Sequence, residues 1–349
     1  MDDPSRPAWE NGARHAARSE RSVRIATFNL ENLDDGPDVE PPLAARLSIL
    51  RPQILRLRAD VLCFQEVNGQ RAGKAQPRNL AALDTLIDPL PCRDFYRAAS
   101  ESPGGGPSDR HNLVVLSRFP IVSAAQYRND LVEAPAYRPA TAYPHADSAQ
   151  PLIWDRPILH VTVRLEDGRP LHLINLHLRA PSAAPVEGQK LDSSTWRTAS
   201  GWGEGCYIAS MKRSGQALEA RLLVDRLFDA EPEALILVCG DLNATEDEVP
   251  VRILRGSDED TNNGALAARA LVPLERSVDP GRRFSVLHHG RPQMLDHILA
   301  SHAMLGLYTG IEIHNEHLSD EMAPDIHVAA APESYHAPVV ASFVPPEGG

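Results

Sequence analysis

The sequence has no apolar run that approaches the ~20 residues needed to span a bilayer. Residues 1–22 also lack the apolar segment that a secretory signal requires. These absences argue against a transmembrane or secreted protein, and we expect a cytoplasmic location. We expect residues 1–22 to form a polar, mobile tail and residues 345–349 to form a second, disordered tail.

Cysteine and net positive charge are also scarce. The four cysteines, Cys63, Cys92, Cys206 and Cys239, do not have the spacing of metal ligands, and Cys63 and Cys239 lie in apolar runs that favour buried free thiols. The net charge is −12, whereas proteins that neutralise the phosphates of duplex nucleic acid are usually basic. Tight sequence-independent duplex binding is therefore unexpected. A local basic cleft, or a small or single-stranded phosphate substrate, remains open.

Sequence signatures of several common protein classes are also absent. The sequence contains no internal repeat, no low-complexity tract, and none of the signatures of P-loop, dinucleotide-binding or serine-hydrolase enzymes. What is present is an ordinary globular composition, with 349 residues of which 42% are hydrophobic. The motifs below run from residue 25 to 339 and build a single site, so we expect one domain over residues 23–344.

Short apolar runs mixed with helical periodicity predict an α/β fold. We expect strands at 23–28, 61–65, 113–117, 158–165, 171–175, 235–239, 294–299 and 338–343, and helices at 43–58, 79–87 and 211–228. Residues 98–112, 127–155 and 181–205 are expected to be irregular. The last of these ends in Gly201-Trp202-Gly203-Glu204-Gly205, but this glycine cluster does not follow a strand, which argues against a phosphate cradle.

Polar residues stand at the ends of the expected strands, where side chains from several strands can share one edge. These are Asn29, Gln65-Glu66, Asn175 with His177, Gly240-Asp241-Leu242-Asn243, and Asp296 with His336. Each alone has an ordinary explanation: a Gly-Asp-Asn sequence favours a turn, and a single histidine is more often structural than catalytic. Their joint occurrence, each after an apolar run, indicates a functional site.

This set of motifs resembles the endonuclease/exonuclease/phosphatase superfamily, over roughly residues 23–343. The most specific parts are Gln65-Glu66, the 240–243 motif and the combination of Asp296 with His336. Residues 27–32 and 113–118 also match. The resemblance implies a four-layer α/β/β/α sandwich of two mixed β-sheets flanked by helices, with the site at one end.

The resemblance also implies metal-dependent chemistry with Mg²⁺ or Mn²⁺. Glu66 would be the principal ligand, because Mg²⁺ prefers hard oxygen ligands and needs few of them, and Asn29 would sit beside the ion. Where the family usually carries a metal-binding aspartate before its last histidine, this chain has Tyr335, and a neutral phenol is a poor ligand. Glu31, two positions after Asn29, is the residue expected to compensate.

The catalytic roles follow from the same resemblance. His336 would be the general base for an attacking water, with Asp296 fixing its tautomer. Asn175, His177 and Asn243 would donate hydrogen bonds to the phosphoryl oxygens. Asp241 would position the water or assist the leaving oxygen, and Arg156 would lie against a backbone phosphate. No glutamate stands in residues 109–112 to support His177, which makes that histidine a phosphate donor rather than an acid.

A nuclease acting on nucleic acid is the leading hypothesis. A phosphatase or lipid phosphodiesterase of the same superfamily is the first alternative, because Trp196 and Trp202 lie in an expected loop that could meet a lipid surface. A non-catalytic binding protein on the same fold is the second alternative, and only Tyr335 supports it. No protein partner is implied.

Overall fold

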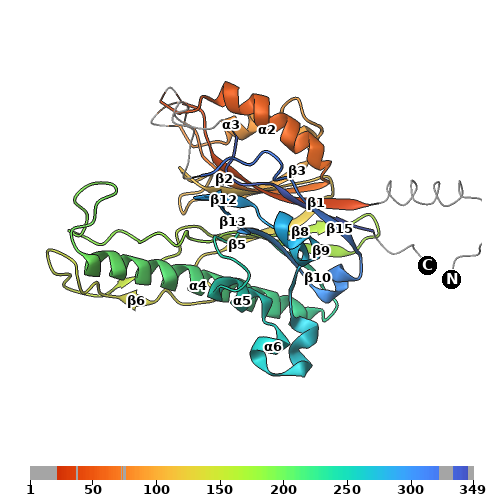
Figure 1. The fold of residues 1–349 in the computed structure, drawn as a ribbon. Coiled ribbons are helices and arrows are strands. Elements are labelled where there is room, and N and C mark those ends of the chain that lie inside the picture. The colour runs from red at the N-terminus through yellow and green to blue at the C-terminus, as the bar shows by residue number, and fades with distance from the viewer. Residues whose placement is uncertain (1–21, 37, 72, 74–75, 322–332, 345–349) are drawn as a thin grey trace, which may run out of the picture.

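Two β-sheets of six strands each pack face to face, and helices cover the outer side of both (Figure 1). The computed structural model describes residues 22–36, 38–71, 73, 76–321 and 333–344. Within these ranges, the sandwich of two mixed sheets that the family resemblance implied is confirmed. The two expected tails, apart from Ser22, lie outside the described residues.

The first sheet runs in the order β15–β16–β1–β2–β4–β3. Its strands are β1 (Val23–Leu33), β2 (Val61–Val67), β3 (Tyr96–Ala99), β4 (Asn112–Ser117), β15 (Tyr308–Ile313) and β16 (Val339–Phe343). β1 and β2 are parallel, and all other neighbours in this sheet are antiparallel. The parallel pair brings Asn29 and Glu66 to the same edge of the sheet.

The second sheet runs in the order β11–β14–β10–β9–β8–β5. Its strands are β5 (Ile121–Tyr127), β8 (Ile158–Arg164), β9 (Pro170–His177), β10 (Leu235–Asp241), β11 (Val272–Pro273) and β14 (Asp296–Ala300). Here β9 and β10 form the parallel pair. Two small hairpins lie outside the sheets: β6 (Ala136–Tyr137) with β7 (Gln150–Pro151), and β12 (Val286–His288) with β13 (Arg291–Gln293).

The two main helical layers lie on opposite sides of the sandwich (Figure 1). α2 (Leu43–Leu57) and α3 (Ala81–Ile87) pack on the first sheet, and α4 (Ala199–Ala230) and α5 (Val249–Arg255) pack on the second. Short helices and 3₁₀ turns make up the rest: α6 (Asp258–Thr261), α7 (His302–Leu305), and turns over Pro91–Asp94, Gly264–Arg269, Leu274–Ser277 and Pro280–Arg282. No helix in the described ranges has both the length and the apolarity needed to cross a membrane.

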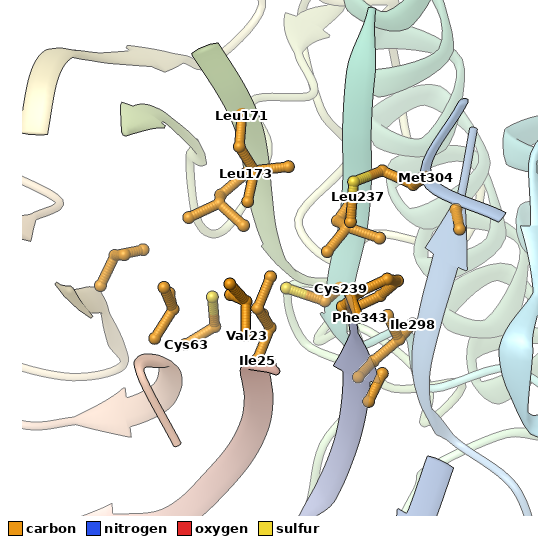
Figure 2. Packing of buried hydrophobic residues seen from close by; sticks show 14 of the residues in the cluster. Val23, Ile25, Cys63, Leu171, Leu173, Leu237, Cys239, Ile298, Met304 and Phe343 are labelled. Atoms are coloured by element: carbon orange, nitrogen blue, oxygen red, sulfur yellow. The ribbon is translucent and has the colours of Figure 1, made fainter. Parts of the chain in front are cut away.

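Apolar side chains fill the space between the sheets. Figure 2 shows Val23 and Cys63 of the first sheet beside Leu173 and Cys239 of the second, and all four are buried in one cluster. Alternate residues of the same strands point outward and pack under the helices. Cys63 and Cys239 are buried free thiols, as expected from their apolar surroundings in the sequence. This core holds the strands in the register that brings their polar ends together.

The expected loop at 181–205 is wrong at its C-terminal end, because α4 already begins at Ala199. The Thr198 side chain caps the helix by accepting a hydrogen bond from the backbone nitrogen of Gly201 at 2.9 Å. The glycines disfavour a helix by propensity, but close packing requires two of the three. A Cβ on Gly201 would lie 2.3 Å from Oε1 of Gln189, whereas a Cβ on Gly203 would meet nothing within 4 Å. A Cβ on Gly205 would lie 2.4 Å from the carbonyl oxygen of Ala184. The glycine cluster is therefore a helix-packing feature.

Candidate active site

Polar side chains from both sheets meet at one end of the sandwich. Asp241 of β10 lies directly opposite His177 of β9 on one side and Asp296 of β14 on the other. From the first sheet, Nδ2 of Asn29 donates to Oδ2 of Asp241 at 3.1 Å and to Oε1 of Glu66 at 3.3 Å. Residues far apart in the sequence therefore form a single site.

Asp241 is the centre of this site, with 2% of its side chain exposed. Asn243 donates to it twice, from its backbone nitrogen at 2.9 Å and from Nδ2 at 3.0 Å. The pKa of Asp241 is raised to about 7, mainly by burial; the His336 charge opposes this rise, and the Asp296 carboxylate adds to it. The preceding Gly240 has a φ of +135°, and a Cβ there would lie 1.9 Å from the carbonyl oxygen of Leu176, so the approach to Asp241 requires glycine.

His336 forms the expected pair with Asp296, through a hydrogen bond of 2.8 Å between Nδ1 and Oδ2. Its other ring nitrogen, Nε2, lies 3.9 Å from Oδ2 of Asp241. Burial alone would lower the pKa of His336, but the carboxylates of Asp296 and Asp241 outweigh burial and raise it well above its usual value. His336 therefore carries a proton at neutral pH in this state and can act as a base only after losing it.

The pKa of His177 shifts in the opposite direction, although two carboxylates lie near this ring as well. Its Nε2 lies 3.5 Å from Oε1 of Glu66 and 3.4 Å from Oδ2 of Asp241, and its side chain is only 2% exposed. The pKa of His177 is well below its usual value, mainly because of burial and also because of the nearby Arg156 charge. The ring is therefore neutral, which suits a hydrogen-bond donor to phosphate better than an acid.

Asn175 does not reach the site as expected from the sequence. It is fully buried between the sheets, where Nδ2 donates to the carbonyl oxygens of Phe64 at 3.1 Å and Val114 at 3.3 Å. Its Oδ1 accepts from Nε2 of Gln65 at 2.7 Å. Since both amide hydrogens are used by the backbone of the first sheet, its geometry does not support the expected role as phosphate donor. Asn175 instead ties the two sheets together beneath the site.

The loop that follows Asp241 is fixed from several sides. Nδ2 of Asn243 also donates to the carbonyl oxygen of Leu178 at 3.0 Å, and the Asn243 carbonyl accepts from Nη2 of Arg213 at 2.7 Å. His297 is fully buried, is paired with Glu275, and contacts the carbonyl oxygen of Ala244 through Nε2 at 2.8 Å. Asn243 therefore borders the site with both amide hydrogens engaged, and it can donate to a phosphate only by exchanging one of these partners.

His111 is a site residue that the sequence analysis missed. Its Nδ1 accepts hydrogen bonds from Nε and Nη2 of Arg156, at 3.2 and 2.7 Å, and its Nε2 lies 2.9 Å from Oδ1 of Asn32. The ring centres of His111 and His177 are 5.8 Å apart. No apolar run precedes His111 in the sequence, so the strand-end pattern could not find it. Arg156 lies at the site, where its guanidinium donates to His111 and to the carbonyl oxygen of Leu178.

Left-handed backbone conformations are concentrated here. Nine non-glycine residues in the described ranges have positive φ. Five of them belong to the site: Glu31 (49°), Asn32 (50°), Glu66 (58°), His111 (59°) and Asn243 (48°). Such conformations are uncommon and cost about 1–3 kcal/mol each. Their concentration is typical of a functional site, where side chains are held in place against local backbone preference.

The donor set fits a divalent cation. Glu66, His177 and Asp241 each offer a ligand atom, and these atoms lie within 4.8 Å of one another; Asp241, Asp296 and His336 form a second such group. Glu31 belongs to neither of these groups. Burial raises the pKa of its carboxyl group, and Glu66 and His336 are among the charged groups near it. Carboxylate oxygens are the ligands that Mg²⁺ and Mn²⁺ prefer.

Comparison with known proteins agrees with this geometry. The sequence model of the Endonuclease/Exonuclease/phosphatase family matches residues 26–320. The chain belongs to this family. It is thus a phosphoesterase-type hydrolase, from a family of enzymes that depend on divalent metals. The match ends before His336, which the three-dimensional contacts place in the site. Among curated protein sequences, none matches this chain significantly.

Solved structures of this family share the fold at low sequence identity. A family protein from Bacteroides thetaiotaomicron has a TM-score of 0.56 at 14% identity, with 93% of this chain and 99% of that chain covered. Truncated TDP2 from Caenorhabditis elegans has a TM-score of 0.53 at 14% identity, with 93% and 98% covered. The 3′ phosphatase NExo from Neisseria, bound to a product DNA hairpin, has a TM-score of 0.51 at 16% identity, with 92% and 99% covered.

Proposed function

We propose that this protein hydrolyses phosphodiester bonds of nucleic acid by activating a water molecule. The observation that carries the proposal is the His336–Asp296 pair, whose free ring nitrogen is directed towards Asp241 at the centre of the site. The bound DNA in the Neisseria relative supports nucleic acid as the substrate class. The net negative charge of the chain favours a single-stranded or local target over a long duplex.

The proposed reaction assigns one proton transfer to each side of the scissile bond. Neutral His336 accepts a proton at Nε2 from the attacking water, whose oxygen forms the new bond to phosphorus. The bond from phosphorus to the leaving oxygen breaks, and Asp241 supplies the proton that this oxygen needs, since burial raises its pKa to about 7. Asp296 fixes the tautomer of His336 through Nδ1.

Other residues in the proposal bind charge. His177, Asn243 and Arg156 donate hydrogen bonds to the phosphate oxygens as negative charge develops on them. Glu66 is proposed as the main ligand of Mg²⁺ or Mn²⁺, with Asn29 beside it and Glu31 nearby. The ion would supply Lewis-acid stabilisation of that charge when bound.

A panel of substrates tests this proposal. Plasmid, single-stranded DNA, RNA, an inositol phosphate and sphingomyelin should each be incubated with Mg²⁺, Mn²⁺ or EDTA. We expect metal-dependent cleavage of a nucleic acid, and loss of that cleavage in EDTA. Turnover of only the inositol phosphate or sphingomyelin would overturn the nuclease assignment. No turnover of any substrate would favour a binding protein, the reading that Tyr335 supports.

A lipid phosphodiesterase is the second candidate. Trp202 and Tyr207, near the start of α4, are 53% and 54% exposed, and aromatic side chains at this end of the molecule could meet a lipid surface. Trp196 does not contribute, because it packs against the cluster around Ala184 and Ile208 and has Lys190 over its ring. The sphingomyelin arm of the panel separates this candidate from the first.

A further inference from the structure

The partners of His111 determine which of its ring nitrogens carries a proton. Arg156 can only donate, and it approaches Nδ1 with two nitrogen atoms, at 3.2 and 2.7 Å. Nδ1 must therefore be the unprotonated acceptor. The hydrogen of the neutral ring is then on Nε2, 2.9 Å from Oδ1 of Asn32, where an amide oxygen is ready to accept it.

Asn32 carries this link to the proposed metal ligand. Its backbone nitrogen donates to Oε2 of Glu66 at 2.9 Å, and both residues have left-handed backbone conformations that make this contact possible. Arg156 is thus linked to the Glu66 carboxylate through the His111 ring and through Asn32, which contacts His111 with its side chain and Glu66 with its backbone. At the other end, Nη1 of Arg156 donates at 3.4 Å to the carbonyl oxygen of Leu178.

We propose that His111 is a positioning residue, a neutral two-way relay that orients Arg156 for the substrate phosphate and Glu66 for the divalent ion. This inference rests on the phosphodiesterase function proposed above and adds to it a residue that touches neither substrate nor metal. A cationic ring would lose the acceptor that Arg156 requires.

Two substitutions separate the two ends of the relay. An asparagine oxygen falls near the position of a histidine Nδ1, and a glutamine nitrogen falls near the position of Nε2. His111→Asn therefore keeps the acceptor for Arg156 and loses the donor to Asn32, whereas His111→Gln does the reverse. His111→Leu removes both. His289→Leu is a matched control, because His289 has a left-handed φ of 50° in an exposed turn and its ring contacts His288.

The experiment measures Mn²⁺ binding without substrate by electron paramagnetic resonance, the KM and kcat for an oligonucleotide and for bis(p-nitrophenyl) phosphate, and the Tm. For His111→Leu we expect a rise of about tenfold in the Kd for Mn²⁺, the size typical of lost support for a metal ligand, together with a rise in KM. His111→Asn should raise mainly the Kd, and His111→Gln mainly the KM. His289→Leu should change neither.

Unchanged Mn²⁺ affinity in His111→Leu would overturn the proposal. Equal shifts of Kd and KM in the Asn and Gln variants, tracking the Tm, would also overturn it, because the ring would then be only a spacer. Absence of nucleic-acid cleavage in the wild type would contradict the proposed function instead. The Mn²⁺ measurement would still decide the role of His111.

Discussion

The candidate active site has two halves, in which the pKa of a buried histidine shifts in opposite directions. In one half, the carboxylates of Asp296 and Asp241 raise the pKa of His336 well above its usual value despite burial. In the other half, burial and the charge of Arg156 lower the pKa of His177. The halves are joined at Asp241, which is close to both rings. In the proposed mechanism these opposite shifts suit His336 to proton transfer and His177 to hydrogen bonding as a neutral ring.

The largest effect is expected from Glu66→Gln, which removes the charge that the proposed ion requires. Metal-stimulated turnover should be lost even at saturating Mg²⁺, while the Tm stays close to that of the wild type because glutamine has nearly the same size and keeps one acceptor oxygen. Glu166→Gln, which changes an exposed glutamate, is the control. Turnover by Glu66→Gln at the wild-type rate would show that Glu66 is not a required metal ligand.

A direct comparison of the halves comes from His336→Gln and His177→Gln. Glutamine can donate a hydrogen bond but cannot act as a base. His336→Gln should therefore lower kcat by about a hundredfold or more, the usual size of general-base loss. His177→Gln should lower it by only about tenfold, the scale of one impaired hydrogen bond. Single-turnover rates measure both, and equal losses would contradict the different roles of the two histidines.

Asp296→Asn tests the cause of the raised pKa of His336. Because a base must be deprotonated, the rate should rise with pH through the pKa of His336. Without the Asp296 charge that pKa falls, so the acidic limb of the pH–rate profile should move to lower pH. The maximal rate should fall as well, because the tautomer is no longer fixed. An acidic limb at the wild-type position would assign the titration to another group.

The smallest effect is expected from Tyr335→Asp, which adds a carboxylate beside His336. Affinity for Mg²⁺ should increase, and half-maximal rate should require less of it. Glu31→Gln should weaken binding more when residue 335 is tyrosine than when it is aspartate. Metal titrations of the wild type, the single variants and the double variant measure this coupling. Unchanged or weaker binding by Tyr335→Asp would refute our account of this position.

The sequence predicted the interior of both sheets and missed all four edges. The eight interior strands were recognised from their apolar runs. The edge strands β3, β5, β11 and β15 were missed, because they are short or have few buried residues; in β5 the residues from Val122 to Gln126 are all exposed. Apolar patterning reports burial, and an edge strand is buried too little to show it.

The site was predicted only in part, because the sequence reveals residues next to apolar runs but not contacts between distant segments. The apolar runs of the expected strands lead directly to Asn29, Glu66, His177 and Asp241, and the order of these residues with Asp296 and His336 matched a known pattern. Asn175 has the same signal, but the facing first sheet takes its amide hydrogens. His111 gave no signal, because its importance comes from Arg156 and Asn32, which are distant in the sequence. Contacts between distant segments cannot be read from local spacing.

The most direct test of the two-halves account is a pH titration of the histidine rings by NMR on isotope-labelled, metal-free protein. Signals would be assigned with His336→Gln and His177→Gln. We predict that His336 titrates above its usual pKa and that His177 stays neutral to well below it. Similar midpoints for the two rings, or a cationic His177 at neutral pH, would contradict the account.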